Sequence, residues 1–421
     1  PTIDATGVDR AVVDTVRSAR EEVLASPESA DAWGELGLVL IAHEFNSQAS
    51  ICLQQAAALD PTDARWPYLQ ANSLLLLAPR DAIPMLERAV ELGGNEPAAP
   101  RLTLVEALLE QHELDDAESH ISNYMSEHPQ DPRARMALGR LLFMRQDYDG
   151  CARTLGPLAR ELEEQRRLPG SRRTLSLLLA ESLQRTGREN EAQVLRERAN
   201  HQTDSKWPDP FLDEVKERRT GLKATLVKAD LMYGRGDYEG SIRILREAVD
   251  DYPESLWAKI YLARALIHTG SPKSPYPDRE ARLRQGVELL QAALENDPNS
   301  VEALFRLGVA KAYQNNHKRA ETLFQRAVDL KPDFTMAYYN LAQSKYKLRN
   351  SEGAIEALRM AVATEPNFAQ GYRMMGVLLL ASRRYEEAES VLQNAVRLNP
   401  NDQEAAKLYA EAERLSTSAN D

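Results

Sequence analysis

Cysteine is nearly absent from this chain of 421 residues, which contains only Cys52 and Cys151. Two cysteines cannot build a disulfide framework or a four-thiolate metal site. Cys151 falls at a position where related segments of the chain carry a small residue, so we expect a packed thiol there. Long apolar runs are also missing, because the run Leu74–Leu77 is short and is soon followed by Pro79. The sequence therefore predicts no membrane-spanning helix.

The short motifs that hold phosphates, zinc or haem are absent as well. Neither GxGxxG nor GxxxxGK occurs, and neither HExxH nor CxxCH is present. His112, His120 and His128 are spaced eight residues apart, but side chains spread over a whole helix cannot converge on one ion. No pair of acidic residues is placed for acid–base work. We therefore expect a non-catalytic protein with no cofactor and no metal site.

Lysine does not occur before Lys206, and charge is unevenly distributed. Residues 1–131 contain 7 Arg and 23 acidic residues, a net charge of −16, whereas residues 132–203 contain 14 Arg and 9 acidic residues, a net charge of +5. This asymmetry could steer a partner of complementary polarity, or it could simply keep a long solvated surface soluble. Nucleic acid is a poor partner, because its phosphates require a net basic surface.

The sequence gives weaker evidence about the source of the protein and its cellular compartment. Abundant arginine without lysine in the first half suggests a bacterial protein. The chain begins at Pro1 rather than at Met, so an export signal would not be visible. We expect a soluble protein without direct membrane insertion, and the sequence leaves open whether it is cytoplasmic or exported to the periplasm.

What the chain does contain is a pattern that returns every 34 residues. In three consecutive segments an alanine is followed by a second alanine seven residues later and a proline five residues after that: Ala320, Ala327 and Pro332; Ala354, Ala361 and Pro366; Ala388, Ala395 and Pro400. Proline lacks a backbone N–H donor and ends a helix. A fixed period of this length is typical of stacked helix pairs.

Within this period, each marker has a packing role. With the proline as position 32, position 8 is Gly308, Ala342 or Gly376, where a small side chain lets two helices approach. Position 24 carries a large apolar residue (Phe324, Leu358 and Leu392), and the alanines at 20 and 27 share its helix face.

These markers resemble the tetratricopeptide repeat. The match extends back to residues 30–63, where eight positions fit: Trp33, Leu36, Gly37, Leu40, Ala49, Leu53, Ala56 and Pro61. The resemblance implies an all-α fold, a right-handed superhelical solenoid of about ten helix pairs. Little chain is left for a catalytic domain.

The repeats and the segments between them suggest a domain organisation. We expect a capping helix in 1–29, five repeats in 30–206, an insert or joint at 207–221, five repeats in 222–402 with an insert at 271–281, and a capping helix with a tail in 403–421. Residues 164–173 are expected to form a loop. Inserts in such arrays are often tolerated loop growth, but they can also belong to the binding face.

The resemblance also implies a concave groove lined by the first helix of each pair. The residues at groove positions are unusually aromatic, broken by arginine: Arg140, Phe143, Tyr233, Trp257, Ile260, Arg264, Phe305, Tyr313, Tyr339, Gln343, Tyr346 and Arg373. Such a composition is enriched at interaction hot spots, although the same rings could instead pack on neighbouring helices.

The leading hypothesis for function is a non-catalytic scaffold or adaptor that binds a protein segment in this groove. The alternative is a structural or assembly subunit of a larger, envelope-associated complex, which would use its convex face and edges. In either case the partners are proteins or peptides, and the chain could belong to a hetero-oligomeric complex. The sequence does not identify the partner.

Overall fold

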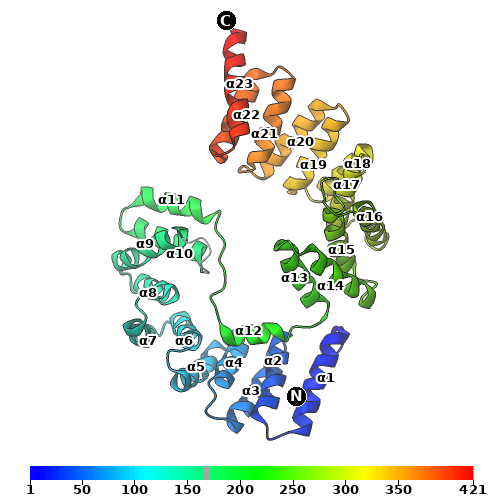
Figure 1. Ribbon diagram of the computed structural model, residues 1–421. Coiled ribbons are helices and arrows are strands. Elements are labelled where there is room, and N and C mark those ends of the chain that lie inside the picture. Colours follow the sequence, from blue (N-terminus) through cyan, green and yellow to red (C-terminus); the bar gives the residue numbers. More distant parts are fainter. Residues whose placement is uncertain (165–169, 421) are drawn as a thin grey trace. The chain divides into compact units, whose positions relative to one another are not determined.

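A computed structural model describes residues 1–164 and 170–420, and its secondary structure in these ranges is helical (Figure 1). An isolated antiparallel bridge joins Ser171 to Asp204. Residues 165–169 of the loop predicted at 164–173 lie outside the described residues. None of the described helices combines the length and the apolarity that a bilayer crossing needs. The fold divides into two compact units, which meet in the sequence between Gly221 and Leu222.

The described residues of unit 1 (Pro1–Gly221) form five helix pairs and two single helices. The single helices are α1 (Arg10–Ala25) and α12 (Pro210–Glu217). The pairs are α2 (Ala30–Ala42) with α3 (Asn46–Leu59), α4 (Arg65–Leu74) with α5 (Pro79–Gly93), α6 (Ala99–Glu110) with α7 (Leu114–Glu127), α8 (Pro132–Met144) with α9 (Tyr148–Glu164), and α10 (Arg172–Arg185) with α11 (Glu189–Ala199). They follow one another along an arc whose inner side is lined by the first helices of the pairs (Figure 1).

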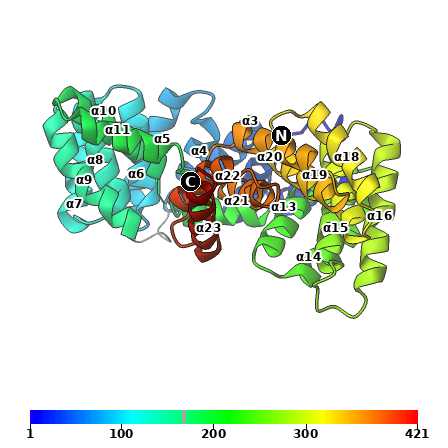
Figure 2. The same ribbon diagram turned by 90° about the horizontal axis from the view of Figure 1, so that it is seen from above.

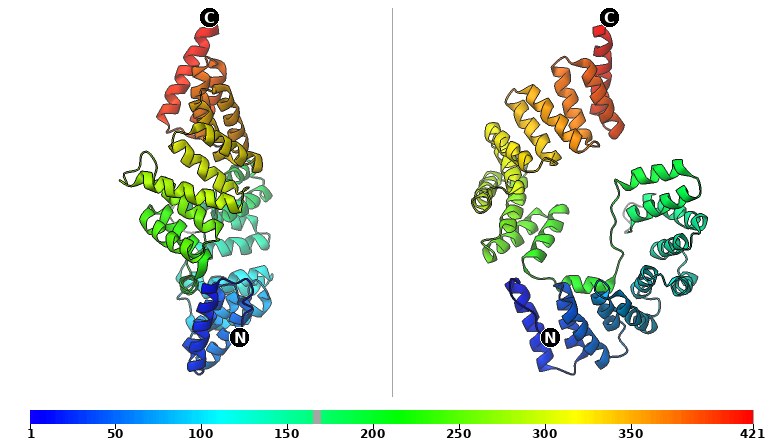
Figure 3. Two further views of the ribbon diagram at one scale, coloured as in Figure 1. Left: turned by 90° about the vertical axis from the view of Figure 1, so that its right-hand side faces the viewer. Right: turned by 180° about the vertical axis from the view of Figure 1, so that it is seen from behind.

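Unit 2 (Leu222–Asp421) continues with five more pairs, the first helix beginning at the boundary residue Gly221. The pairs are α13 (Gly221–Gly234) with α14 (Tyr238–Asp251), α15 (Leu256–Thr269) with α16 (Arg279–Asn296), α17 (Val301–Tyr313) with α18 (His317–Leu330), α19 (Thr335–Lys347) with α20 (Ser351–Thr364), and α21 (Ala369–Ala381) with α22 (Tyr385–Leu398). The last helix, α23 (Gln403–Asn420), packs against α22 (Figures 2 and 3). The predicted all-α solenoid of about ten helix pairs is confirmed.

Small residues set the distance between the two helices of a pair. A β-carbon added to Gly308 would lie 2.6 Å from the ring of Phe324, and one added to Gly376 would lie 2.4 Å from Leu392. Carbon atoms do not approach so closely, so even the β-carbon of an alanine at Gly308 or Gly376 would force the neighbouring side chain to shift. Ala354, at position 20 of its repeat, is fully buried. The packing roles predicted for these markers are therefore confirmed.

Most turns within a pair are closed by a residue with positive φ at position 15 of the repeat. These residues are Glu44, His112, Gln146, Gly187, Gly236, Asn315, Arg349 and Arg383. A left-handed residue is a common way to end a helix, because it lets the following N–H groups satisfy the last carbonyls. Two pairs depart from this pattern. In α4–α5 the residue at this position, Ala78, has a φ of −147°. In α15–α16 Gly270 has a negative φ, and a longer connection leads to Arg279, in the region of the insert predicted at 271–281.

Candidate protein-binding surfaces

The first helices of unit 2 carry most of the residues that we expected to line a groove. Trp257 on α15 is 53% exposed, Tyr346 on α19 is 44% exposed, and Tyr313 at the end of α17 is 37% exposed. Gln343 is also exposed, and four further side chains are partly buried: Tyr233, Arg264, Tyr339 and Arg373. Exposed large aromatic rings recur on successive first helices, which is uncommon on a purely solvating surface.

The prediction of a groove position is wrong for two residues, Ile260 and Phe305, because both belong to the core. Ile260 is 1% exposed and Phe305 is 6% exposed. The ring of Phe305 packs against Phe324, 5.8 Å away between centroids, and against Phe334, 4.7 Å away. Both residues sit at position 5 of their repeats, which here faces the neighbouring helices instead of a partner. They stabilise the array and offer no surface.

A cluster centred on Arg264 forms the most structured part of the surface. The Arg264 guanidinium lies 4.3 Å from the ring centroid of Tyr233 and 4.9 Å from that of Tyr261. It also pairs with the carboxylate of Asp230. Trp257 meets Tyr261 edge-on, with 6.3 Å between centroids. Cation–π contacts hold flat rings at a fixed orientation, so this cluster presents Trp257 on a rigid support.

Tyr233 joins this cluster to a second set of rings. Its centroid is 5.2 Å from Tyr238 and 5.4 Å from His268, and both contacts are edge-on. Burial raises the pKa of Tyr233, and the nearby Arg264 acts in the opposite direction. Burial also lowers the pKa of His268. Because the ordinary value for histidine is already below neutrality, both rings are uncharged at neutral pH and the patch is largely apolar.

Farther along unit 2, the predicted residues are tied more closely to the fold. Tyr339 meets Phe368 edge-on at 5.3 Å between centroids. Arg373 pairs with Glu404, with 2.5 Å between nitrogen and oxygen, and with Asp402 at 3.4 Å. Both predicted arginine anchors, Arg264 and Arg373, are therefore engaged with acidic residues of the same chain. A partner carboxylate would have to displace these acids to reach them.

The predicted residues of unit 1 show the same engagement. Arg140 lies 4.0 Å from Glu110, and Phe143 meets Tyr148 edge-on at 5.4 Å between centroids. Other arginines of the basic segment reach acidic residues of the preceding pair, such as Arg133 with Glu106 at 3.0 Å. Some of the arginine in 132–203 thus links one helix pair to the next.

A feature that sequence analysis missed is α12, in the segment predicted only as an insert or joint. It lies on the inner side of unit 1, against α2 and α4 (Figure 1). Asp209 caps its first turn by accepting a hydrogen bond from the N–H of Leu212 at 3.0 Å. The other carboxylate oxygen of Asp209 accepts a hydrogen bond from the hydroxyl of Tyr68 on α4. Burial and the Asp209 carboxylate raise the pKa of Tyr68, which keeps this donor protonated.

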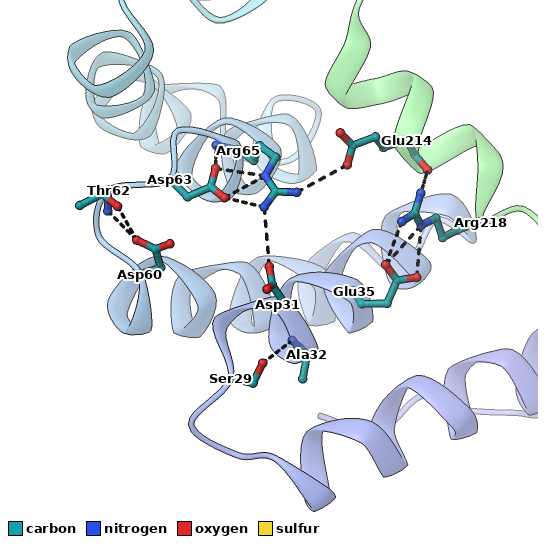
Figure 4. A network of polar contacts seen from close by, with 10 residues as sticks. All are labelled: Ser29, Asp31, Ala32, Glu35, Asp60, Thr62, Asp63, Arg65, Glu214 and Arg218. Atoms are coloured by element: carbon teal, nitrogen blue, oxygen red, sulfur yellow. Dashed lines mark hydrogen bonds and ion pairs between the residues drawn. The ribbon is translucent and has the colours of Figure 1, made fainter.

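Charged groups hold the C-terminal half of α12 on the array, as Figure 4 shows. Arg218 donates hydrogen bonds to both carboxylate oxygens of Glu35 in α2, at 3.0 Å from Nη2 to Oε2 and 3.2 Å from Nε to Oε1. Glu214 lies 3.9 Å from Arg65, which also pairs with Asp63 at 2.6 Å. Forked arginine–carboxylate pairs of this kind combine strength with a defined orientation.

The local signals for α12 were present in the sequence. Asp209 followed by Pro210 is a helix-start pattern, and apolar residues follow at Phe211, Leu212 and Val215. Sequence reasoning also did not select Tyr238, Tyr261 and His268. Tyr238 and Tyr261 lie outside the positions that the resemblance assigns to a groove, whereas His268 lies at such a position and was overlooked. Their contacts with Tyr233 and Arg264 appear only once two helix pairs are packed together.

Family models described as tetratricopeptide repeat match the chain in several places. One model matches residues 226–274, 279–333 and 307–371, a second matches 108–168, and a third matches 369–412. Together they cover more than half of the sequence. None of the curated proteins compared with the chain matches it.

Solved structures of other repeat proteins also match parts of the chain. MamA from Desulfovibrio magneticus RS-1 is 19% identical, with 43% of this chain and 96% of that protein covered and a TM-score of 0.37. A thermophilic TPR protein from Thermus thermophilus is 17% identical, with 45% and 97% covered and a TM-score of 0.36. YrrB, described as a TPR protein with an unusual peptide-binding site, is 16% identical, with 47% and 97% covered and a TM-score of 0.35.

Proposed function

Because the chain belongs to the tetratricopeptide repeat family, whose members are in general non-catalytic protein-interaction folds, we propose that it is a scaffold that binds a segment of a partner protein along unit 2. The exposed rings of Trp257, Tyr313 and Tyr346 carry this proposal, since they lie on three different first helices. Aromatic side chains offer a large contact area and lose little conformational entropy on binding.

The partner segment that suits this surface is extended or a single helix, with apolar side chains that pack on the rings. The two arginines of the predicted groove that lie in unit 2, Arg264 and Arg373, are paired with Asp230, Asp402 and Glu404. They therefore support the shape of the surface more than they offer open charge. Tyr339 packs against the core and contributes to stability as well as to the surface. The apolar contact area, rather than ionic attraction, is expected to dominate the affinity.

The test is a triple substitution, Trp257→Ala, Tyr313→Ala and Tyr346→Ala, in the full chain. A matched control replaces Leu330 and Met360 by alanine as well. These two residues are exposed to a similar extent on second helices (42% and 44%). Partners are first identified by co-purification and mass spectrometry, and the affinity of each purified partner is then measured. Truncating an aromatic hot spot costs about 2 kcal/mol or more, so we expect at least a thirtyfold loss with the triple variant and little change with the control.

Unchanged binding of the triple variant, with helical content intact, would contradict this proposal. A constant set of partners in fixed stoichiometry that is insensitive to the triple substitution would instead favour the structural or assembly subunit of a larger complex. In that case the edges and second helices of the array would carry the interaction.

A further inference from the structure

Part of the inner surface that the first helices α2 and α4 form in unit 1 is covered by α12. Tyr68 on α4 occupies position 5 of its repeat and is 0% exposed, and its ring lies 5.4 Å from that of Phe211 in α12. Glu35 on α2, at position 6, binds Arg218. Both contacts join first helices of the array to a segment that is far away in the sequence.

The inner face of α12 has the pattern of a helical ligand. Phe211 and Leu212 pack against the helices of unit 1, and Val215 is 4% exposed within the same core cluster as Leu36 and Trp66. The spacing of 211, 215 and 218 is the i, i+4, i+7 arrangement by which a single amphipathic helix anchors in a groove. The opposite face carries the exposed residues Asp213, Lys216 and Glu217.

The way in which α12 is held also separates it from the helix pairs of the array. It is a single helix of eight residues between non-helical segments, whereas the first helices α2, α4, α6, α8 and α10 each pair with the second helix that follows. Much of its attachment is polar: the Tyr68 hydroxyl binds Asp209, Arg218 binds Glu35, and the hydroxyl of Thr220 lies 3.2 Å from His43 Nε2. A segment that is held by few buried apolar side chains opens at a lower free energy than the core around it.

From these contacts we infer that α12 is a displaceable internal ligand of unit 1, and that a helix of a partner protein competes with it for the inner surface of α2 and α4. The competing helix has the chemistry of α12: an acidic residue at its N-cap to accept from Tyr68, an aromatic residue two positions later, a branched aliphatic residue after one more turn, and an arginine to meet Glu35. This inference concerns unit 1 and does not depend on the proposed function of unit 2.

Because α12 is joined to its site by the chain itself, it competes strongly with any free partner helix. A segment joined to its site by a short linker has an effective concentration on the order of 1 mM. A free helix of the same sequence must therefore reach about 1 mM to displace half of α12 from the wild-type chain. Weakening α12 without touching α2 or α4 removes this competition.

The experiment measures the binding of a fluorescent peptide with the sequence of residues 205–220 to the full chain by anisotropy. The release variant is Phe211→Ala with Val215→Ala, which removes two anchors of α12 and leaves the surface of α2 and α4 unchanged. The matched control is Asp213→Ala with Lys216→Ala, an exposed pair on the outer face of the same helix whose charged groups lie 2.6 Å apart. We expect the release variant to bind the peptide at least tenfold more tightly than the wild type and the control do.

Two further measurements keep the inference falsifiable. The same peptide with Asp209→Ala should bind the release variant at least fivefold more weakly, because the Tyr68 hydroxyl then lacks its acceptor. A release variant with normal helical content that binds the peptide no better than the wild type overturns the inference. If the release variant does not fold, hydrogen exchange of the wild-type chain decides: amides of 211–218 that exchange as slowly as those of α2 and α4 overturn it, and amides that exchange at least tenfold faster support it.

Discussion

Tyr68 and Tyr339 occupy the same position of their repeats, on the first helices of pairs in unit 1 and unit 2, yet their surroundings differ. Tyr68 is completely buried beneath Phe211 and donates its hydroxyl hydrogen to Asp209. Tyr339 remains partly exposed, with its ring edge-on to Phe368 of the next turn. The same repeat position is thus completely covered at Tyr68 and partly exposed at Tyr339, whereas Ile260 and Phe305 of unit 2 are buried there by neighbouring helices. At Tyr68 the covering group comes from an extra segment of chain, not from the repeat.

The two units also differ in how much these apolar surfaces contribute to stability. In unit 1 the apolar surface of α2 and α4 is buried by Phe211, Leu212 and Val215, so it contributes to the stability of that unit. In unit 2 the exposed rings of Trp257 and Tyr346 contribute little to stability and are available to a partner. Substitutions at equivalent places should therefore have opposite consequences: loss of stability in unit 1 and loss of binding in unit 2.

The largest effect is expected where the two units are alike. Ala49 in α3 and Ala354 in α20 are both fully buried at position 20 of their repeats. Replacing either by arginine forces a charge without a partner into the space between packed helices, at a cost of about 3–5 kcal/mol. Hydrogen exchange should show loss of protection centred on the unit that carries the substitution. Unchanged melting of either variant would show that the repeat register is wrong.

Truncation of an aromatic ring should change the stability of the two units to different extents. Phe211→Ala removes a ring that packs on two core clusters of unit 1, and we expect the free energy of unfolding to fall by about 1–3 kcal/mol. Trp257→Ala in unit 2 removes a ring that is 53% exposed, and we expect a change within about 0.5 kcal/mol. Chemical denaturation of both variants provides the measurement. Equal losses would mean that Trp257 is a structural residue.

Removal of a single hydroxyl group sharpens the comparison at Tyr68. Tyr68→Phe keeps the ring but leaves the buried carboxylate of Asp209 without this donor, at a cost of about 1–3 kcal/mol. Tyr346→Phe, on the exposed surface of unit 2, serves as the control and should be nearly neutral. If Tyr68→Phe is neutral as well, the hydrogen bond to Asp209 does not hold α12.

The smallest difference is expected at alkaline pH. Both cysteines are in unit 1, where burial raises the pKa of Cys52 to about 11 and also raises that of Cys151. Because the folded state holds these protons more tightly than the unfolded state does, their contribution is complete below the ordinary cysteine pKa of about 8.5. It is lost as the pH rises toward 11. Denaturation from pH 8 to 11 should show a steeper loss for the wild type than for Cys52→Ala with Cys151→Ala. Parallel curves would contradict this assignment.

Much of the fold could be predicted because its determinants are local and repeated. Gly308 and Phe324 are only sixteen residues apart, and their contact requires nothing beyond one helix pair. The same spacing recurs at Gly376 and Leu392. A repeat with an unclear pattern can therefore be placed from the register of the others. Helix ends follow from proline and from left-handed turn residues, which also act locally.

The surfaces were harder to predict, for a physical reason that Ile260 and Phe305 illustrate. Whether a side chain on a first helix meets solvent or the next pair depends on how closely the pairs stack, and one repeat does not contain that information. Ile260 and Phe305 proved to be buried, whereas Trp257, three residues before Ile260, is exposed. The cluster around Arg264 likewise depends on two pairs that place Tyr233 and Tyr261 on either side of it.

The sequence by itself determined the helix pair, its period and the tight packing of its two helices, since each of these depends on residues within a single repeat of 34 residues. Only the tertiary structure decided which side of each repeat remains exposed and where α12 lies. Tyr68 and Asp209 are separated by 141 residues, and no local pattern can bring together groups so far apart. Their pairing arises from the curvature of the stacked array, which places the first helices of unit 1 within reach of its last segment.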